Sequence, residues 1–420
     1  MDFLHTSDLH FIPDHLSETP LAECYFAVFQ EIADIAIDKK IKYLLISGDM
    51  FDKPNPHTSV VLRVVKTLRV LRDYGIRVIV VPGNHDISRA KISVLHVLNE
   101  AGLLHLLDFS EEFDWLIMDP IVFEDDKLVF YGIPGFRGGS SREVKYLKDK
   151  LVKFKNEAQL RGYNKVILAH INTKFAGYDP SKYEKRYGKL YLDYEDLFRR
   201  LPENTIYVAL GHIHIPIPPD HLFRGNIAYS GSPIGINIDD LIETYQLRSK
   251  DVHRRVLYVD TSTTPPSITA IKLENIPLVH YARLSIKDIN DLKNQVLKLI
   301  NEIEISKYTV LIIDAVGLDR LSSELEQFTR EVLRKKNILL VIRSFSTSLM
   351  LIQHNGNINI PASSLDWSIS EIEDTVLRIF IEKNKVKTSV EKLKQIIDKL
   401  GSSDQPPEIL LREILKDIGD

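Results

Sequence analysis

The strongest constraint on the fold of this chain is a repeated pattern in which short apolar runs end in aspartate, asparagine or histidine. Five segments have this form, namely "FLHTSDLH", "YLLISGDMFD", "VIVVPGNHD", "KVILAHIN" and "YVALGHIHIP". Short apolar runs bounded by turn residues are typical of buried strands. Ligand sites in open α/β sheets form at the carboxyl ends of the strands, so we expect the polar ends of these runs to meet in one site.

Helical patterns separate the first three of these runs. Apolar residues recur at helical spacing in "LAECYFAVFQEIADIAIDKK" and again in "HTSVVLRVVKTLRVLRDYG", where Gly75 is a helix stop signal. The residues that share a helix face are Phe26, Phe29, Ile32, Ala33 and Ala36 in the first segment and Val61, Val64, Leu68 and Leu71 in the second. This alternation predicts an α/β fold in which helices cover a parallel or mixed sheet.

The rest of the chain divides into further segments. "IVFEDDKLVFYGIP" predicts a hairpin with its turn near Asp125 and Asp126, and "NIAYSGSP", "RRVLYVD" and "SITAIKL" are interpreted as antiparallel strands that close a first domain, residues 1–275. A β-α-β-α-β pattern predicts a small second domain at residues 276–352. A polar linker with one helix, residues 353–383, leads to amphipathic helices at residues 384–420.

Composition narrows the class of protein. The chain of 420 residues is 44% hydrophobic and 27% charged, with a formal net charge of -4, as is usual for globular proteins. The negative charge argues against a generally basic nucleic-acid binder, so a nucleic-acid contact must use a local patch. Cys24 is the single cysteine, which excludes an internal disulfide and a cysteine-based zinc site. Without a signal core or an apolar run of membrane-spanning length, we expect a cytoplasmic protein.

The polar ends of the five runs contain the chemistry of a metal site. Taken singly, an aspartate after a strand is often a cap or turn former, and a lone histidine is usually structural. Five such motifs at five strand ends favour one shared site instead. A mixture of imidazole, carboxylate and amide suits manganese, iron or zinc better than magnesium. The candidate residues are Asp8, His10, Asp49, Asn84, His85, His170, His212 and His214.

Such a set favours phosphoester hydrolysis. Two divalent cations about 3.5–4 Å apart can hold a phosphate and activate a water molecule, and an aspartate with two oxygens can bridge them. In a strand, side chains two residues apart point to the same face, so His212 and His214 are expected to be presented together by the strand that precedes them.

The order of the motifs, D-x-H, G-D-x-x-D, G-N-H-D, a lone histidine after a strand and G-H-x-H, resembles the calcineurin-like metallophosphoesterase superfamily over about the first 235 residues. "FLHTSDLHF", "GDMFDKPNP" and "YSGSP" are similar to one branch, the meiotic recombination eleven nucleases, called SbcD in bacteria. The resemblance implies a layered phosphoesterase core, a small DNA-facing capping domain, two manganese ions, DNA as substrate and a homodimer.

The resemblance also implies roles for individual residues. One metal would be held by Asp8, His10, Asp49 and His214, and the second by Asp49, Asn84, His170 and His212, with Asp49 as the bridge. His85 would stabilise or protonate the leaving oxygen. Some members have histidine at the position of Asp52, in a role tied to cutting from DNA ends. Asp52 is therefore a candidate for positioning substrate, and the balance of exonuclease and endonuclease activity stays open.

Basic residues alternate with aromatic residues in the segment from Asn172 to Arg200, directly after His170. Basic side chains pair with phosphates and aromatic rings stack on unpaired bases, so this segment is a candidate DNA contact. Its candidate residues are Lys182, Lys185 and Arg186, and a weaker second group is Arg137 and Arg142. The alternative is a solvated surface loop.

The terminal helices have apolar faces that include Leu393, Ile397, Leu410 and Ile414. The resemblance implies that such helices bind the coiled coil of an SMC-like ABC ATPase of double-strand-break repair, SbcC in bacteria. The alternative is that they pack on their own core.

Two other functions remain open at this point. One is a protein phosphatase or a small-molecule phosphodiesterase. Protein Ser/Thr phosphatases usually have an arginine soon after the second motif, where "GDMFDKP" has lysine and proline, and a compact phosphodiesterase would not need the second domain and the terminal helices. The other is a scaffold that bridges DNA ends and has a vestigial metal site. The complete set of candidate ligands favours a metal-dependent DNA nuclease over both.

Overall fold

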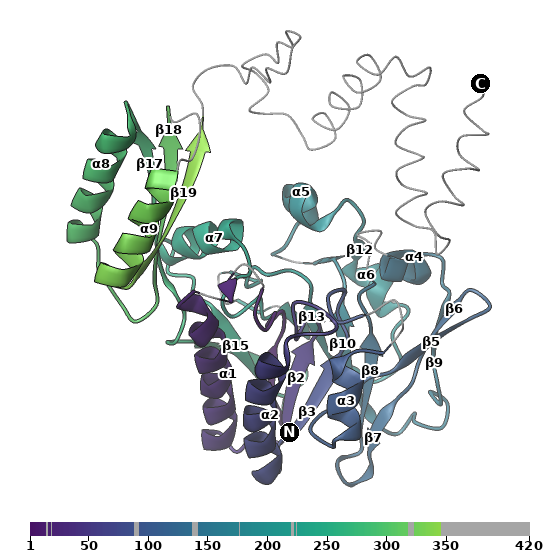
Figure 1. The fold of residues 1–420 in the computed structure, drawn as a ribbon. Coiled ribbons are helices and arrows are strands. Elements are labelled where there is room, and N and C mark those ends of the chain that lie inside the picture. Colours follow the sequence, from purple (N-terminus) through teal and green to yellow (C-terminus); the bar gives the residue numbers. More distant parts are fainter. Residues whose placement is uncertain are drawn as a thin grey trace, which may run out of the picture. The chain divides into compact units, whose positions relative to one another are not determined.

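The structure of the protein is a computed structural model that describes residues 1–345, except 14–15, 18, 88–91, 137–141, 176, 220–221, 224 and 318–322. The chain divides into two compact units, Met1–Thr347 and Ser348–Asp420. The predicted linker and terminal helices, with Leu393, Ile397, Leu410 and Ile414, lie outside the described residues. The first unit is described below and in Figure 1.

Two sheets form the centre of this unit. The first has the strand order β16-β15-β1-β2-β3-β4, and the second has the order β14-β13-β10-β8-β7. The strands of the first sheet are β1 (Asp2–Thr6), β2 (Tyr43–Ser47), β3 (Arg77–Val81), β4 (His105–Leu106), β15 (Arg255–Asp260) and β16 (Ser267–Lys272). Those of the second are β7 (Ile121–Phe123), β8 (Leu128–Ile133), β10 (Asn164–His170), β13 (Thr205–Gly211) and β14 (Ile227–Tyr229).

The central strands of the two sheets are apolar on both faces, and this explains how the sheets stack. Phe3 and Leu45 point to one side and pack with Phe130 and Leu168 of the second sheet in one buried cluster. Neighbouring side chains along a strand point to opposite faces of the sheet. Leu4 of β1 and Leu44 and Ile46 of β2 therefore point to the other face of the first sheet, where they form a separate apolar cluster with the helices. Sheets buried on both faces need continuous apolar strands, which is the pattern seen in the sequence.

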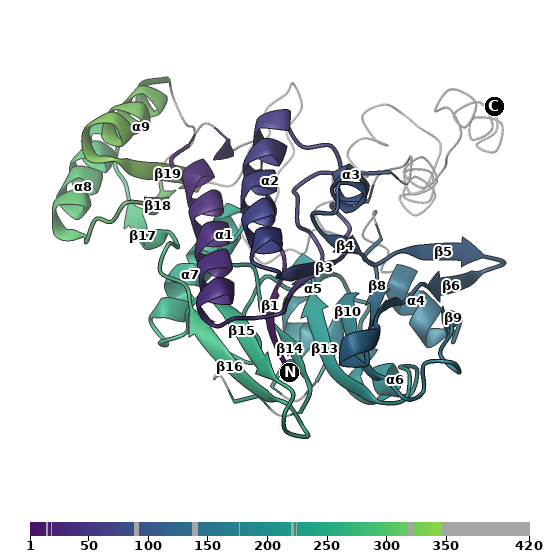
Figure 2. The same cartoon turned by 90° about the horizontal axis from the view of Figure 1, so that it is seen from below.

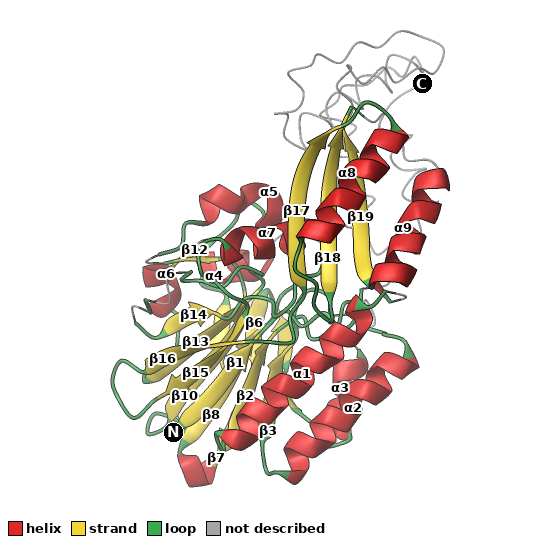
Figure 3. Cartoon of the chain, turned by 90° about the vertical axis from the view of Figure 1, so that its left-hand side faces the viewer, coloured by secondary structure: helices red, strands yellow, loops and turns green. Residues whose placement is uncertain are grey.

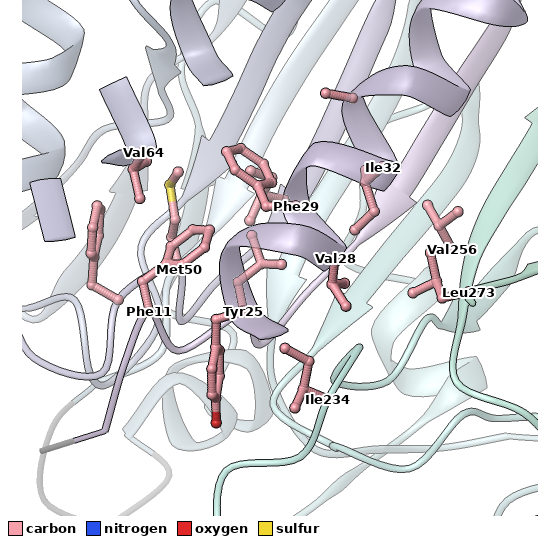
Figure 4. Packing of buried hydrophobic residues seen from close by; sticks show 14 of the residues in the cluster. Phe11, Tyr25, Val28, Phe29, Ile32, Met50, Val64, Ile234, Val256 and Leu273 are labelled. Atoms are coloured by element: carbon pink, nitrogen blue, oxygen red, sulfur yellow. The ribbon is translucent and has the colours of Figure 1, made fainter. Parts of the chain in front are cut away.

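Helices cover the outer face of the first sheet. They are α1 (Leu21–Asp38), α2 (Thr58–Asp73) and α3 (Val94–Glu100), and Figure 3 shows them side by side along the strands. Figure 4 shows part of the apolar cluster beneath them, in which Tyr25, Phe29 and Ile32 of α1 pack together with Phe11 and Met50 from the loops after β1 and β2. The prediction that the apolar faces of these helices pack against the sheet is therefore confirmed.

Smaller elements cover the second sheet. They are α4 (Arg142–Lys148), α5 (Glu184–Tyr187), α6 (Tyr194–Phe198), the short pair β11 (Thr173–Lys174) and β12 (Leu192–Asp193), and a three-stranded sheet of β5 (Phe109–Glu112), β6 (Trp115–Met118) and β9 (Val152–Phe154). Figure 2 shows the three-stranded sheet beside α4, whose Arg142 and Tyr146 bind Glu111 of β5.

The strand patterns predicted the pairing well, with one error. The hairpin is confirmed, because β7 and β8 pair in antiparallel fashion across a turn at Glu124–Asp126, and β15 and β16 are antiparallel as expected. The interpretation of "NIAYSGSP" as an antiparallel strand is wrong, since β14 runs parallel to β13. The connection from residue 212 to 226 is long enough to return the chain to the start of the sheet before β14 begins.

A β-α-β-α-β segment follows the core, as the sequence predicts. It consists of β17 (Leu278–Ser285), α8 (Ile289–Glu302), β18 (Thr309–Val316), α9 (Ser323–Lys336) and β19 (Ile338–Phe345), and its sheet is parallel. The helices cover one face. On the other face, Val310 and Ile312 join the apolar cluster that contains α1 and Leu241 of α7 (Ile238–Arg248). The boundary at 275/276 stays a prediction, because core and cap belong to the same compact unit.

Among the described residues, no helix has both the length and the apolar character that crossing a membrane requires.

Candidate metal centre

The candidate residues lie at the carboxyl ends of β1, β2, β3, β10 and β13, with His170 as the last residue of β10 and the others on the loops that follow the strands. Three of these strands belong to the first sheet and two to the second, so both sheets contribute to the site. Asp8, His10, Asp49 and His212 have the left-handed backbone, with φ of 53°, 43°, 49° and 90°. Residues other than glycine rarely adopt this conformation, and where they do it is often at functional sites. Hydrogen bonds from Asp8 N to Gly48 O (3.0 Å) and from His10 N to Asp49 O (2.9 Å) hold the first two loops together.

The carboxylate of Asp49 lies at the centre of the cluster. Its Oδ1 accepts a hydrogen bond from the backbone N–H of His85 at 2.8 Å. Its Oδ2 lies 3.2 Å from Nε2 of His170 and 3.5 Å from Nε2 of His10. One oxygen of Asp49 therefore faces imidazoles from both halves of the predicted ligand set.

Asp8, His10 and His214 form one side of the cluster. Their ligand atoms all lie within 4.8 Å of one another, which is close enough for one metal ion to contact all three. Nε2 of His214 is 3.9 Å from Oδ1 of Asp8, and the rings of His10 and His214 are 5.2 Å apart.

His170 forms the other side of the cluster. Its Nε2 lies 3.0 Å from Oδ1 of Asn84, and its ring centre lies 5.2 Å from that of His212. Nδ1 of His170 is 3.0 Å from the carbonyl oxygen of Ser47, to which it donates a hydrogen bond. In the neutral ring this bond leaves the lone pair on Nε2, which faces the oxygens of Asn84 and Asp49 as a metal ligand would.

The charges of the cluster fit divalent cations. Burial would raise the pKa of Asp49, but His170 and His10 outweigh it and hold this pKa well below its ordinary value. Burial would lower the pKa of His170, but Asp49 and Asp8 outweigh it and raise this pKa to about 10. Burial and the charge of His170 lower the pKa of His212 to about 3, which keeps its ring neutral. Protons and metal ions are alternative partners for such buried carboxylates.

His10 gives an independent test of the fit. Its side chain is fully buried, yet neither ring nitrogen has a hydrogen-bond partner within the described part of the chain. Buried polar atoms are almost always hydrogen-bonded or bound to a metal, because an unsatisfied group costs about 1–3 kcal/mol. A cation bound by His10 together with Asp49 and Asp8 would satisfy Nε2, which lies nearest to Asp49.

His85 lies at the edge of the cluster. Its Nδ1 donates a hydrogen bond to the backbone oxygen of Asp52 at 2.9 Å. The carboxylate of Asp52 is 3.8 Å from the same nitrogen and 3.5 Å from Nδ1 of His10. Ligand atoms of His10, Asp52 and His85 also lie within 4.8 Å of one another, a combination that the sequence did not predict.

A sequence profile of the calcineurin-like phosphoesterase family matches residues 1–216, just over half of the 420-residue chain. The chain belongs to this family. The match covers the loops that carry the candidate ligands described above, through His214.

This phosphoesterase is Mre11-like. It is 26% identical over 276 residues to the DNA double-strand break repair protein Mre11 of Saccharolobus solfataricus, covering 65% of this chain and 64% of the relative. The Mre11 protein of Archaeoglobus fulgidus is 28% identical over 249 residues (59% and 51%), and that of Methanocaldococcus jannaschii is 27% identical over 299 residues (71% and 73%). The chain spans between about half and two thirds of the first two relatives.

The phosphoesterase site opens into a cavity of about 340 Å³. Its lining includes Asp49, His85 and His170, together with Glu143 and Tyr187, which the sequence did not predict for the metal site. Burial raises the pKa of the Glu143 carboxyl, and Tyr187 accepts a hydrogen bond from the N–H of His214 at 3.1 Å. Tyr187 belongs to the basic and aromatic segment from Asn172 to Arg200, and Glu143 directly follows Arg142, so both lie in or beside the candidate DNA contacts of the sequence.

The candidate DNA-binding residues differ in where the structure places them and in whether their side chains are described. Arg186 lines the cavity but forms ion pairs with Asp240 and Glu243, so its charge is already compensated. Arg142 is exposed and pairs with Glu111. Arg137 and the side chains of Lys182 and Lys185 lie outside the described residues. The DNA contacts stay predictions.

His212 and His214 reach the site in a different way from the one expected. β13 ends at Gly211, so the two histidines are not presented by a strand, and that expectation is wrong. The N–H of His212 donates a hydrogen bond to the carboxylate of Asp8 (3.1 Å), and His212 has a left-handed backbone. The rings nevertheless separate, His212 toward His170 and His214 toward His10.

Two aspartates outside the predicted set support the site. Asp86 accepts hydrogen bonds from the N–H groups of Gly83, Met50 and Phe51 at 3.0–3.2 Å and so ties the β2 loop to the β3 loop. A side chain at Gly83 would collide with Asp49, so the close approach of these loops requires glycine there. Asp240 hydrogen-bonds to Nδ1 of His214 at 3.0 Å.

Proposed function

We propose that this protein is a two-metal, manganese-dependent DNA nuclease that processes DNA ends in double-strand-break repair, as an exonuclease, an endonuclease or both. Its partner would be an SMC-like ABC ATPase, and it would act as a homodimer in the cytoplasm, associated with the nucleoid. Membership of the phosphoesterase family and similarity to proteins named Mre11 support the proposal. The observation that carries it is the position of Asp49 Oδ2 between imidazoles of the two ligand groups.

The residues divide into two ligand sets. Asp8, His10 and His214 would hold one cation with Asp49. Asn84, His170 and His212 would hold the second, again with Asp49. When bound, the two cations supply the positive charge that polarises a phosphodiester and activates water.

His85 is placed to act on the leaving group. Its Nδ1 is occupied by the backbone of Asp52, which orients the ring at the lining of the cavity. As an imidazolium it would transfer a proton from Nε2 to the departing 3′ oxygen, and the nearby carboxylate of Asp52 would stabilise its positive charge.

DNA would enter through the cavity beside the metal centre. The segment from Asn172 to Arg200 passes this opening, since Arg186, Tyr187 and Gly188 line it. Lys182 and Lys185 are the proposed phosphate contacts there, and Arg137 and Arg142 the second group. Leu393, Ile397, Leu410 and Ile414 are the proposed contacts to the ATPase.

The test is cleavage of a labelled duplex and a hairpin DNA with Mn²⁺ by the wild type and by His85→Asn. Loss of a general acid lowers the rate by about 10²–10⁴-fold. We expect this loss in kcat while Mn²⁺ binding, measured by calorimetry, stays close to that of the wild type.

His253→Asn is the matched control, because His253 pairs with Asp251 and does not line the cavity. It should cleave like the wild type. A wild type that cleaves neither DNA would contradict the proposed function, and a fully active His85→Asn would contradict the role of this residue.

A further inference from the structure

We propose that Asp240, in the first turn of α7, is a positioning residue that fixes the ring of His214 with its Nε2 toward the metal. The inference rests on the proposed function only in assuming that the site binds divalent cations. No motif of the sequence includes Asp240, which lies 26 residues beyond His214.

Asp240 is fully buried and both of its oxygens are in use. Oδ2 accepts hydrogen bonds from Nδ1 of His214 at 3.0 Å and from the N–H of Ile236 at 2.8 Å. Oδ1 forms an ion pair with Arg186, which also binds Glu243 at 3.0 Å. The carboxylate is thus held in place from three directions.

This arrangement selects one tautomer of His214. An ionised carboxylate only accepts hydrogen bonds, so the proton of the neutral imidazole must be on Nδ1. The lone pair is then on Nε2, which lies 3.9 Å from Asp8. A carboxylate that accepts from a metal-binding histidine also makes the ring a stronger ligand, and its loss typically costs 10–100-fold in metal affinity.

The backbone of His214 is tied to the same turn of α7. Arg254, which is buried, donates hydrogen bonds to the carbonyl oxygens of His214, of Ser232 (3.0 Å) and of Asp240 (3.0 Å). Side chain and main chain of His214 therefore both depend on α7. By contrast, His170 and His85 donate to backbone carbonyls, of Ser47 and Asp52.

The neighbouring residue Asp239 provides a matched control. It is in the same turn of α7 and has the same charge, but its side chain is 75% exposed and pairs with Arg343 of β19 at 3.2 Å. Asp239→Asn removes one negative charge from the helix start without touching His214.

The experiment is a calorimetric titration with Mn²⁺ of the full chain, freed of metal beforehand. The wild type should bind two ions. Asp240→Asn should bind one of them 10–100-fold more weakly, as His214→Asn does, and Asp239→Asn should bind both like the wild type. The double variant Asp240→Asn/His214→Asn should be no weaker than His214→Asn alone, because Asp240 acts through His214.

Wild-type affinity for both ions in Asp240→Asn would overturn the proposal. A double variant with a further loss at the second ion would overturn it too, since Asp240 would then act by another route. Thermal unfolding in a chelator should first show that each variant is folded.

A measurement on the wild type covers the case in which Asp240→Asn does not fold. With ¹⁵N-labelled histidine, the shifts of the side-chain nitrogens report the tautomer, and the signal missing in His214→Asn identifies this residue. The proposal requires the Nδ1–H form in the metal-free protein, and the Nε2–H form would overturn it. Neither the Mn²⁺ titration nor the ¹⁵N measurement uses DNA. Both can therefore be interpreted even if the protein proves not to be a nuclease.

Discussion

At the scale of single residues, the site depends on buried charges whose partners are other side chains and backbone N–H groups. Asp49 combines a hydrogen bond from His85 with contacts to two imidazoles. Asp86 has no candidate metal contact, yet its carboxylate satisfies three buried N–H groups on two loops. Removing an acceptor from buried donors is costlier than losing one hydrogen bond, because the donors cannot return to water.

Asp86→Ala should therefore lower the free energy of unfolding by on the order of 3 kcal/mol, at about 1 kcal/mol for each N–H left without an acceptor. Urea unfolding in a chelator measures this change without a metal contribution. Asp73→Ala is the control, because Asp73 is exposed and pairs with the adjacent Arg72. Equal stability of the two variants would contradict the role of Asp86.

His5 gives a prediction for pH. Burial lowers the pKa of His5 from 6.5 to about 3, so the folded protein keeps this ring neutral where the unfolded chain binds a proton. The unfolded state takes up more protons as the pH falls below about 6.5, and stability is lost in that direction. The contribution should fall by about 2 kcal/mol between pH 7.5 and pH 5.

His5→Gln should remove this part of the pH dependence, measured as the difference in urea midpoints between pH 7.5 and pH 5 in a chelator. Tyr207→Phe is the control, because it removes the hydroxyl that binds Nδ1 of His5 at 2.8 Å but leaves the ring to titrate. An unchanged pH slope in His5→Gln would refute the explanation.

At the scale of elements, the sequence predicts most where chemistry and periodicity are local. The apolar faces of α1 and α2 and the polar ends of β1, β2 and β3 are readable from a few neighbouring residues. The direction of β14 is not, because it depends on the path of the connection before it. β5, β6 and β9 were missed for a related reason, since strands of three or four residues carry little periodicity.

The contacts of the residues that support the site could not be predicted from the sequence either. In the sequence, Asp240 resembles any acidic residue in the first turn of a helix, where its negative charge interacts favourably with the positive end of the helix dipole. Its contact with His214 depends on how α7 packs, which no local pattern encodes. Arg186 was predicted as a DNA contact from its basic and aromatic neighbours, but the fold brings it to Asp240 and Glu243.

The segment from Asn172 to Arg200 can be tested with its lysines alone. Lys182→Ala/Lys185→Ala should weaken DNA binding and reduce the slope of log K against log salt by roughly 1 to 2, about one for each phosphate that the variant no longer neutralises. Fluorescence anisotropy over a range of salt concentrations measures both. Lys39→Ala/Lys40→Ala, at the exposed end of α1, is the control, and identical salt slopes in the two double variants would exclude a role for Lys182 and Lys185 in phosphate binding.

At the scale of the whole unit, the metal centre joins two sheets. Asp8, His10, Asp49 and Asn84 come from the first sheet, and His170, His212 and His214 from the second. A ligand that binds only the folded state stabilises it by RT ln(1 + [L]/Kd), about 2.7 kcal/mol at 100 times Kd. Mn²⁺ should therefore raise the melting temperature, and a chelator should reverse the shift.

Variants show whether this stabilisation needs both sheets. Asn84→Ala and His170→Ala, one from each sheet, should each reduce the shift in melting temperature caused by Mn²⁺. Differential scanning calorimetry measures it. A full shift in both variants would mean that the cation stabilises the protein elsewhere.

The position of β1 has a consequence for how the protein is made. β1 leads directly to Asp8 and His10, but it lies between β2 and β15, and β15 begins only at Arg255. During synthesis on the ribosome, β1 can therefore pair with β15 only after most of the core has been synthesised. A nascent or truncated chain that ends before this point lacks the complete sheet beneath Asp8. The chain thus gains a finished cleavage centre only late in its own synthesis.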